Sequence, residues 1–183
     1  MTSLLPTAPG LDEPLEILEA CHGRIAHQLQ TLERLQLHLR AQGSDVEAQQ
    51  AAAAILHYFN TAGRHHHADE ESDLFPCLLG KAETPAALRD LIAQLLTDHQ
   101  AMEAAWQQLE QELKRLTLPG AEVSVLQEET VSRFVGLYRQ HLTKENELLL
   151  PAARKLLVAD DIQHLGQAMA ARRGVRLVPG LGA

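Results

Sequence analysis

Two stretches of this sequence place a histidine and a glutamate four residues apart. The first, residues 64–76, reads RHHHADEESDLFP, and the second, residues 139–151, reads RQHLTKENELLLP. They align without gaps, and the equivalent pairs are His66 with Glu70 and His141 with Glu145. Imidazole and carboxylate groups without a thiolate suit iron, manganese or zinc. The chemistry that these pairs indicate is therefore the binding of a metal ion.

On an α-helix both members of each pair would face the core, because residues three or four apart share a helix face. The first pair shares its face with the apolar residues Ile55, Phe59 and Leu74. The second pair shares its face with Phe134, Leu137, Leu148 and Leu149. We therefore expect both pairs to point into an apolar interior.

Apolar periodicity and helix-end signals predict four long helices that would carry these residues. Their expected ranges are 14–43, 44–76, 85–116 and 122–151. Asp12, Glu13 and Pro14 resemble a helix start, Gly43 a helix end, and Ser44 with Glu47 a capping box for the second helix.

Prolines and connecting segments define the other expected boundaries. Pro76 ends the second helix, and Pro151 is expected to end or kink the fourth. Residues 77–83 form a connection, Thr84 with Pro85 starts the third helix, and residues 117–121 form a turn. A short fifth helix is expected over residues 160–173.

A single histidine lies within the apolar stripe of each of the other two helices, His22 in the first and His99 in the third. His22 lies about 21 residues before the first bend and His66 about 23 after it, which places both roughly 32–34 Å from that bend. His99 and His141 lie roughly 30–33 Å from the second bend by the same count. In a four-helix bundle, four histidines and two glutamates would therefore meet in one layer.

Such a layer would be unfavourable without a counter-charge. One histidine on an apolar helix face is more often a hydrogen-bonded core residue than a metal ligand. Six ionisable groups at one depth are different, because each uncompensated buried charge costs several kcal/mol and no inward Lys or Arg is present to neutralise them. A bound cation supplies the missing charge, and each carboxylate could bridge two ions.

Composition limits the other functions. The chain has 183 residues, 45% of them hydrophobic, which predicts one domain over residues 12–173 between tails at 1–11 and 174–183. A net charge of -8 argues against nucleic acid and anionic membranes as partners. No membrane span or signal peptide is recognisable, so we expect a cytoplasmic protein. Cys21 and Cys77 are expected to be reduced thiols.

The segments HHHADEESDLFP and HLTKENELLLP, each preceded by a helix with one inward histidine, resemble the motifs of the hemerythrin-like (HHE cation-binding) domains over about residues 15–157. The resemblance implies an all-α, up-down-up-down four-helix bundle with two non-haem iron ions, for which manganese or zinc are alternatives. The ligands implied are His22, His66, Glu70, His99, His141 and Glu145. Ferritin-like bundles fit less well, because they use Glu-x-x-His on two helices and Glu on the others.

Two departures from the family affect the function expected. Oxygen-carrying hemerythrins have a fifth histidine four residues from the third-helix ligand, where this chain has Leu95 and Glu103. Relatives that repair iron-sulfur clusters have a cysteine-rich N-terminal segment, where this chain has only Cys21. Glu103 lies one turn after His99, so it would either ligate the second ion or remain a solvated charge.

The register of the first motif has an alternative, because His65 with Asp69 and His67 with Glu71 have the same four-residue spacing. We choose His66 because only this register matches His141 and Glu145. His65 and His67 would then either support the ligands from behind or lie at the surface, and we favour the surface.

Three functions follow as hypotheses. The first is a di-iron protein that binds or senses dioxygen or nitric oxide. The second is an enzyme or repair factor, either an oxidoreductase acting on peroxide or oxygen or a donor of iron to damaged iron-sulfur clusters. The third is a metal-free helical interaction module.

Overall fold

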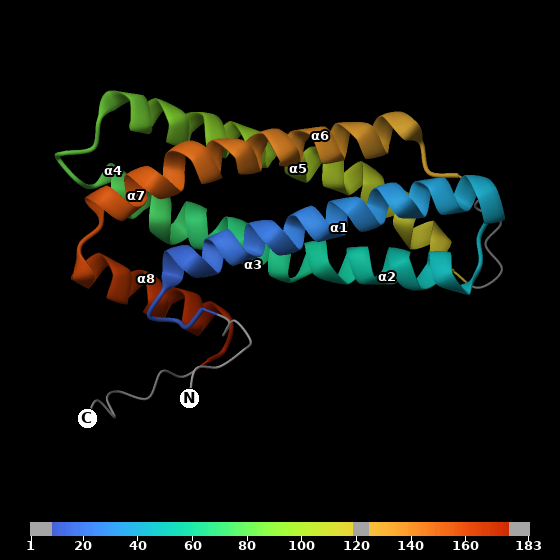
Figure 1. The fold of residues 1–183 in the computed structure, drawn as a ribbon, viewed down its shortest axis with the longest axis horizontal. Coiled ribbons are helices and arrows are strands. Elements are labelled where there is room, and N and C mark those ends of the chain that lie inside the picture. The colour runs from blue at the N-terminus through green and yellow to red at the C-terminus, as the bar shows by residue number, and fades with distance from the viewer. Residues whose placement is uncertain (1–8, 119–124, 176–183) are drawn as a thin grey trace, which may run out of the picture.

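The computed structural model describes residues 9–118 and 125–175, which form an elongated bundle of helices (Figure 1). Within these ranges the secondary structure consists of helices and turns, without a strand. The α-helices are α1 (Pro14–Gln42), α2 (Val46–Asn60), α3 (Ala62–Asp69), α4 (Phe75–Leu79), α5 (Ala86–Leu116), α6 (Glu128–Lys144), α7 (Leu150–Leu156) and α8 (Ala159–Arg172). Two π-helical turns are η1 (Glu70–Leu74) and η2 (Glu145–Leu149).

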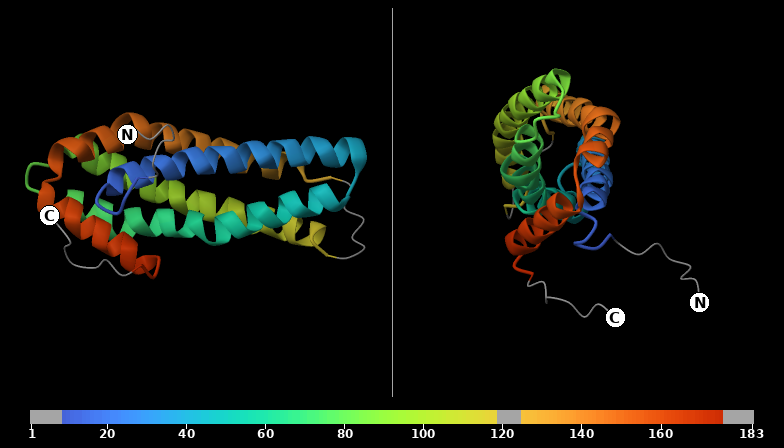
Figure 2. Two further views of the ribbon diagram at one scale, coloured as in Figure 1. Left: turned by 60° about the horizontal axis from the view of Figure 1, so that its bottom comes forward. Right: turned by 90° about the vertical axis from the view of Figure 1, so that its left-hand side faces the viewer.

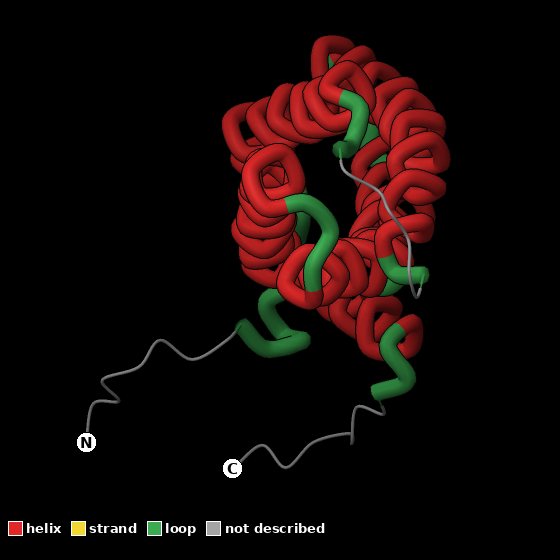
Figure 3. Tube along the Cα trace, turned by 90° about the vertical axis from the view of Figure 1, so that its right-hand side faces the viewer, coloured by secondary structure: helices red, strands yellow, loops and turns green. Residues whose placement is uncertain are grey.

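Four rods make up the bundle, and successive rods run in opposite directions (Figure 1). The first rod is α1, and the second is the succession α2, α3, η1 and α4. The third rod is α5, and the fourth is α6, η2 and α7. Viewed end on, the four rods lie around a common axis (Figure 3). This is the predicted up-down-up-down four-helix bundle.

Helix α8 lies outside the four rods, against one end of the bundle (Figures 1 and 2). It contacts α1, α3 and η1, and it corresponds to the fifth helix expected from the sequence. The backbone N–H of Val158 donates a hydrogen bond to Oδ2 of Asp161 at 2.8 Å, which caps its first turn.

The apolar core consists of two clusters separated along the bundle. One cluster surrounds Phe59, Trp106 and Phe134, and the other surrounds Leu18, Leu74 and Leu95. On each of the four rods, the predicted histidine or His–Glu pair falls between a residue of one cluster and a residue of the other. The depth count from the sequence therefore correctly placed a polar layer inside the bundle.

The expectation that Pro76 ends the second helix was wrong, as was the placement of residues 77–79 in a connection. The rod continues through α4 to Leu79, and the fourth rod likewise continues past Pro151 through α7. A proline lacks an N–H, and its ring clashes with the carbonyl four residues earlier in a regular α-helix. The π-helical turns η1 and η2 precede the two prolines and change the hydrogen-bond spacing there.

Three smaller boundaries also differ from prediction. The residue that caps α2 is Asp45 rather than Ser44, since Oδ1 of Asp45 accepts a hydrogen bond from the N–H of Ala48 at 2.8 Å. The non-helical backbone of Thr61 interrupts the second rod between α2 and α3. Residues 125–127 precede α6 without being helical, whereas the predicted start at Glu122 and the turn at Pro119–Gly120 lie outside the described residues.

None of the described helices is long and apolar enough to cross a membrane.

Candidate metal centre

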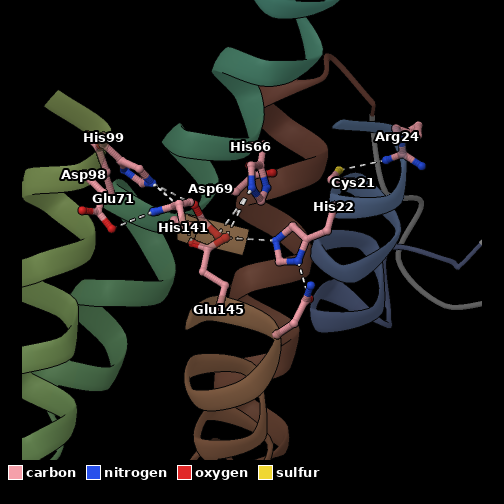
Figure 4. A network of polar contacts seen from close by, with 12 residues as sticks. Cys21, His22, Arg24, His66, Asp69, Glu71, Asp98, His99, His141 and Glu145 are labelled. Atoms are coloured by element: carbon pink, nitrogen blue, oxygen red, sulfur yellow. Dashed lines mark hydrogen bonds and ion pairs between the residues drawn. The ribbon is translucent and has the colours of Figure 1, made fainter. Parts of the chain in front are cut away.

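Four histidines and two glutamates meet in the polar layer between the two apolar clusters. They come from all four rods: His22 from α1, His66 and Glu70 from α3 and η1, His99 from α5, and His141 and Glu145 from α6 and η2. Each is at most 4% exposed. Figure 4 shows the four imidazoles and Glu145 turned toward one another. The structure thus brings together six of the seven ligands predicted from the sequence.

These six residues form two overlapping groups of candidate ligand atoms. In the first group, Nε2 of His22 lies 3.2 Å from Oε2 of Glu145. Nε2 of His66 lies 3.7 Å from Oε1 of Glu70 and 4.0 Å from Oε2 of Glu145. Within this group one ligand atom from each residue lies within 4.8 Å of the others. The group can therefore surround one ion.

The second group uses the other two histidines and the same two glutamates. Nε2 of His99 lies 3.0 Å from Nε2 of His141 and 3.4 Å from Oε2 of Glu70. Nε2 of His141 lies 2.9 Å from Oε1 of Glu145. Each glutamate therefore presents one oxygen to the first group and its other oxygen to the second. This is the arrangement that a carboxylate needs in order to bridge two ions.

The π-helical turns fix where these glutamates lie, because each turn begins at one of them. The N–H of Phe75 bonds to the carbonyl of Glu70, and the N–H of Leu150 bonds to the carbonyl of Glu145, each five residues apart. A π-helical turn adds a residue to a helical repeat and changes the direction of the side chains within it. Both glutamates are wholly buried in this geometry.

The two carboxyl groups differ in acidity in the metal-free protein. Burial and the neighbouring Glu145 carboxylate raise the pKa of Glu70 well above its usual range. Burial acts in the same direction on Glu145, but the close approach of the His141 and His22 imidazoles outweighs it, so the pKa of Glu145 lies well below its usual range. In the metal-free protein, the protonated form is thus favoured for Glu70 and the ionised form for Glu145.

The surroundings of two of the ligand histidines, His66 and His99, favour the neutral form of imidazole that binds metals. Burial lowers the pKa of His66 to about 3. Burial and the neighbouring His141 also lower the pKa of His99. A neutral imidazole offers a nitrogen lone pair to a metal ion, whereas a protonated one does not.

Unpartnered polar atoms show that the layer suits a cation. Nε2 of His22 and of His66, and both oxygens of Glu70 and Glu145, are buried without a hydrogen-bond partner among the described residues. Leaving such groups unpartnered in an apolar interior costs free energy, and a bound cation would satisfy all of them. The residues present therefore fit a pair of metal ions.

The outer nitrogens of the histidines bond to residues that sequence reasoning did not identify. Nδ1 of His99 donates to Oε1 of Glu71 at 2.6 Å, and Nδ1 of His22 donates to Oδ1 of Asn146 at 2.6 Å. Such partners orient metal-binding imidazoles. The signal for them was their position directly after the two ligand glutamates.

Two further outer nitrogens complete the set. Nδ1 of His141 lies 3.5 Å from Oδ2 of Asp98, a distance at which it makes no hydrogen bond. Nδ1 of His66 is buried and has no partner within the described part of the chain.

The structure does not bring Glu103 into either group. Its side chain is exposed, and its Oε1 accepts a hydrogen bond from Nε2 of Gln107 at 3.3 Å. It lines a surface cavity of about 630 Å³ together with His67 and His99. Ligation by Glu103 would require the side chain to leave this position, and it stays a prediction.

His65 and His67 are both half-buried, and of the two positions considered for them His67 takes the one beside the ligands. The ring of His67 stacks on that of His99 with centroids 4.1 Å apart, and its Nε2 is buried without a partner among the described residues. The sequence did not indicate this contact, because His99 lies on a different rod, α5.

Comparisons with known proteins agree with this site. Residues 13–153 match the family model described as the hemerythrin HHE cation binding domain. An uncharacterized protein from Haemophilus influenzae is 31% identical over 166 residues, which cover 90% of this chain and 92% of that relative. The matched segment contains all six residues that meet in the polar layer.

Proposed function

The chain belongs to the hemerythrin HHE cation-binding family, and on this basis we propose that it holds two non-haem iron ions and binds or senses dioxygen or nitric oxide. The observation that carries the proposal is the division of the oxygens of Glu70 and Glu145 between the two ligand groups. Imidazole and carboxylate ligands without thiolate suit iron.

Each residue of the layer would have a definite part in this centre. His22 and His66 would hold one ion, His99 and His141 the other, and the two glutamates would bridge them. This set gives each ion four protein ligands and leaves room for a small molecule. When bound, the iron ions would supply an open coordination position for dioxygen or nitric oxide and the electrons that stabilise the bound molecule.

The surroundings of the layer support a small, uncharged ligand. The two apolar clusters cover the polar layer on both of its sides along the bundle axis. Phe75 lies beside His99 at a ring-centroid distance of 6.0 Å, and Tyr138 lies beside His67 at 5.9 Å. Dioxygen and nitric oxide are small and uncharged, so they can enter such an interior without losing a shell of bound water.

We also propose that the protein acts in the cytoplasm.

Iron content and ligand binding test the proposal together. Protein purified after iron-replete expression should contain about two iron equivalents. After anaerobic reduction, it should form a stable adduct with nitric oxide or dioxygen, visible by absorption, and should not consume peroxide catalytically. An iron content below about half an equivalent would instead support the metal-free interaction module.

The same experiment addresses the enzymatic alternative. Sustained consumption of peroxide or oxygen by the iron-loaded protein would support an oxidoreductase and overturn the binding function. Transfer of iron to a cluster-free acceptor protein would support the repair function. A double variant with Glu70→Gln and Glu145→Gln is the matched control, because it retains the bundle side chains but lacks both bridging charges.

A further inference from the structure

Two hydrogen bonds link the halves of the metal centre in equivalent ways. Glu71 directly follows the first ligand glutamate and accepts a hydrogen bond from Nδ1 of His99 at 2.6 Å. Asn146 directly follows the second ligand glutamate and accepts a hydrogen bond from Nδ1 of His22 at 2.6 Å. In each case the acceptor belongs to one helical hairpin and the histidine to the other. The internal repeat therefore makes these bonds a matched pair.

The matched bonds differ in the charge of the acceptor. Glu71 offers a carboxylate oxygen, whereas Asn146 offers a neutral amide oxygen. A carboxylate behind a metal-binding histidine draws on the Nδ1 proton and makes Nε2 a more basic ligand. A neutral amide orients the ring in the same way but donates less electron density.

The other two ligand histidines, His141 and His66, also differ in whether a carboxylate lies near Nδ1. Nδ1 of His141 lies 3.5 Å from a carboxylate oxygen of Asp98, and Nζ of Lys144 holds that carboxylate in place with a hydrogen bond of 2.7 Å. Nδ1 of His66 has no partner among the residues described. Behind the imidazoles of the group that contains His141 there are thus one hydrogen-bonded carboxylate, that of Glu71, and a second one nearby, that of Asp98. The described residues place no carboxylate on the outer nitrogens of the other group.

We propose that Glu71 is a positioning residue that makes the two metal positions unequal: the ion held by His99 and His141 binds first and more tightly than the ion held by His22 and His66. The inference rests on the two-ion centre proposed above. The bridging glutamates do not create the difference in affinity between the two positions, because each glutamate presents one oxygen to the first ligand group and the other oxygen to the second.

Metal-binding measurements test the order of binding directly. Metal-free protein titrated with Co²⁺, whose visible absorption reports its coordination, should show two steps that differ at least about tenfold in affinity. Glu71→Gln should weaken the tighter step by about 10- to 100-fold and leave the looser step within about twofold. Asn146→Glu should strengthen the looser step and reduce the difference in affinity between the two steps.

Glu147→Gln is the control, because Glu147 is exposed next to Asn146 and makes no hydrogen bond or ion pair with a described residue. It should leave both steps unchanged. Thermal melting of each metal-free variant separates a loss of fold from a loss of affinity. If Glu71→Gln fails to fold, Asn146→Glu decides alone, since it predicts a gain in affinity.

The outcomes separate this inference from the function on which it rests. Binding of fewer than two Co²⁺ ions by the unaltered protein would contradict the two-ion centre itself. Two ions with equal affinity, or a Glu71→Gln variant that weakens the looser step or neither step, would overturn the inference and leave the two-ion centre in place.

Discussion

Glu70 and Glu145 are the residues on which the centre depends most, because among the described residues they alone belong to both ligand groups. Each is wholly buried, and within residues 9–118 and 125–175 neither carboxylate is paired with a Lys or Arg side chain. In the proposed two-ion centre, removing one of them would take an oxygen ligand from each ion at once. Removing a histidine would take a ligand from one ion only.

Substituting these ligands should therefore have unequal effects. Glu70→Ala or Glu145→Ala should lower the occupancy of both metal positions, whereas His22→Ala should mainly lower the occupancy of its own group. Metal counts on purified variants, made under identical loading conditions, provide the measurement. Loss of one ion only in both glutamate variants would contradict bridging.

Glu103 tests whether the third helix contributes a further ligand. A carboxylate ligand on the ion held by His99 and His141 would stabilise the ferric state. If Glu103 ligates, Glu103→Gln should raise the reduction potential of the iron-loaded protein and slow its oxidation in air. Gln107→Ala serves as a control, because it removes only the hydrogen bond that Glu103 makes at the surface. Unchanged potential and oxidation rate in Glu103→Gln would place Glu103 outside the ligand set.

At the scale of the elements, α8 is attached to the rod that carries the first His–Glu pair. Asp69 on α3 is wholly buried and accepts hydrogen bonds from Arg172 and Arg173. Arg172 also donates to Oδ2 of Asp73 at 2.6 Å. Asp69 directly precedes the ligand Glu70, so this clamp holds the backbone at the metal centre as well as the fifth helix.

Asp69→Asn should destabilise the protein more than Asp73→Asn does. It removes the charge from a buried acceptor of both arginines, with an expected loss of about 1–3 kcal/mol, because hydrogen bonds to charged groups are the stronger ones. Asp73 is partly exposed and, among the residues that the structure describes, contacts one arginine, Arg172, so its variant is the matched control. Chemical denaturation of both variants measures the difference, and equal stabilities would argue against the clamp.

The two π-helical turns are the second feature of this scale. Both begin at a ligand glutamate and both precede a proline in the continuing rod. A proline in a regular helix would disturb the hydrogen bonds of the preceding turn, and the wider turn accommodates it. The same local change that lets the rod continue also sets the position of the ligand.

At the scale of the whole molecule, the polar layer divides the core into two apolar clusters. The stability of the bundle therefore depends on how well this layer is satisfied. Six buried ionisable side chains lie where a soluble bundle would otherwise place apolar residues. A bound metal pair should be part of the folding free energy.

Removal of the metal should lower the melting temperature. A ligand present at about 1,000 times its dissociation constant contributes about 4 kcal/mol, which for a chain of this size corresponds to a shift on the order of 10 °C. Thermal unfolding before and after chelation gives the measurement. A Glu70→Gln, Glu145→Gln variant should show little shift on chelation. An unchanged melting temperature in the unaltered protein would indicate a solvated layer.

The metal-free protein should lose stability as the pH falls from about 7 to about 5. The pKa of His66 in the folded state, about 3, lies below its ordinary value of 6.5, so the unfolded chain binds more protons in this range. Burial also lowers the pKa values of His67 and His99. The raised pKa of Glu70 has the opposite effect on stability, because it favours the folded state at lower pH. Glu70 is one group, however, whereas His66, His67 and His99 all act in the other direction.

Urea denaturation of the metal-free protein at the two pH values measures this effect. A His66→Gln variant should show a weaker dependence on pH, because it lacks one of the groups that must be protonated on unfolding. A metal-free protein that is as stable at the lower pH as at the higher one would contradict the burial of neutral imidazoles.

The sequence by itself determined the bundle and the residues that meet in its polar layer. Helical periodicity fixes which side chains share a face, and the constant rise per residue converts positions in the chain into depth. His22, His66, His99 and His141 could thus be assigned to one layer before any packing was known. The repeated four-residue spacing identified the two glutamates for the same reason.

Only the tertiary structure decided what surrounds those ligands. The bonds from His99 to Glu71 and from His22 to Asn146 cross between hairpins, and their existence depends on how the rods are rotated against each other. The contacts of Asp69 with Arg172 and Arg173 depend on the docking of the fifth helix. These arginines lie 103 and 104 residues from Asp69 along the chain. Periodicity within one helix carries no information on such contacts, because they are set by the packing between helices.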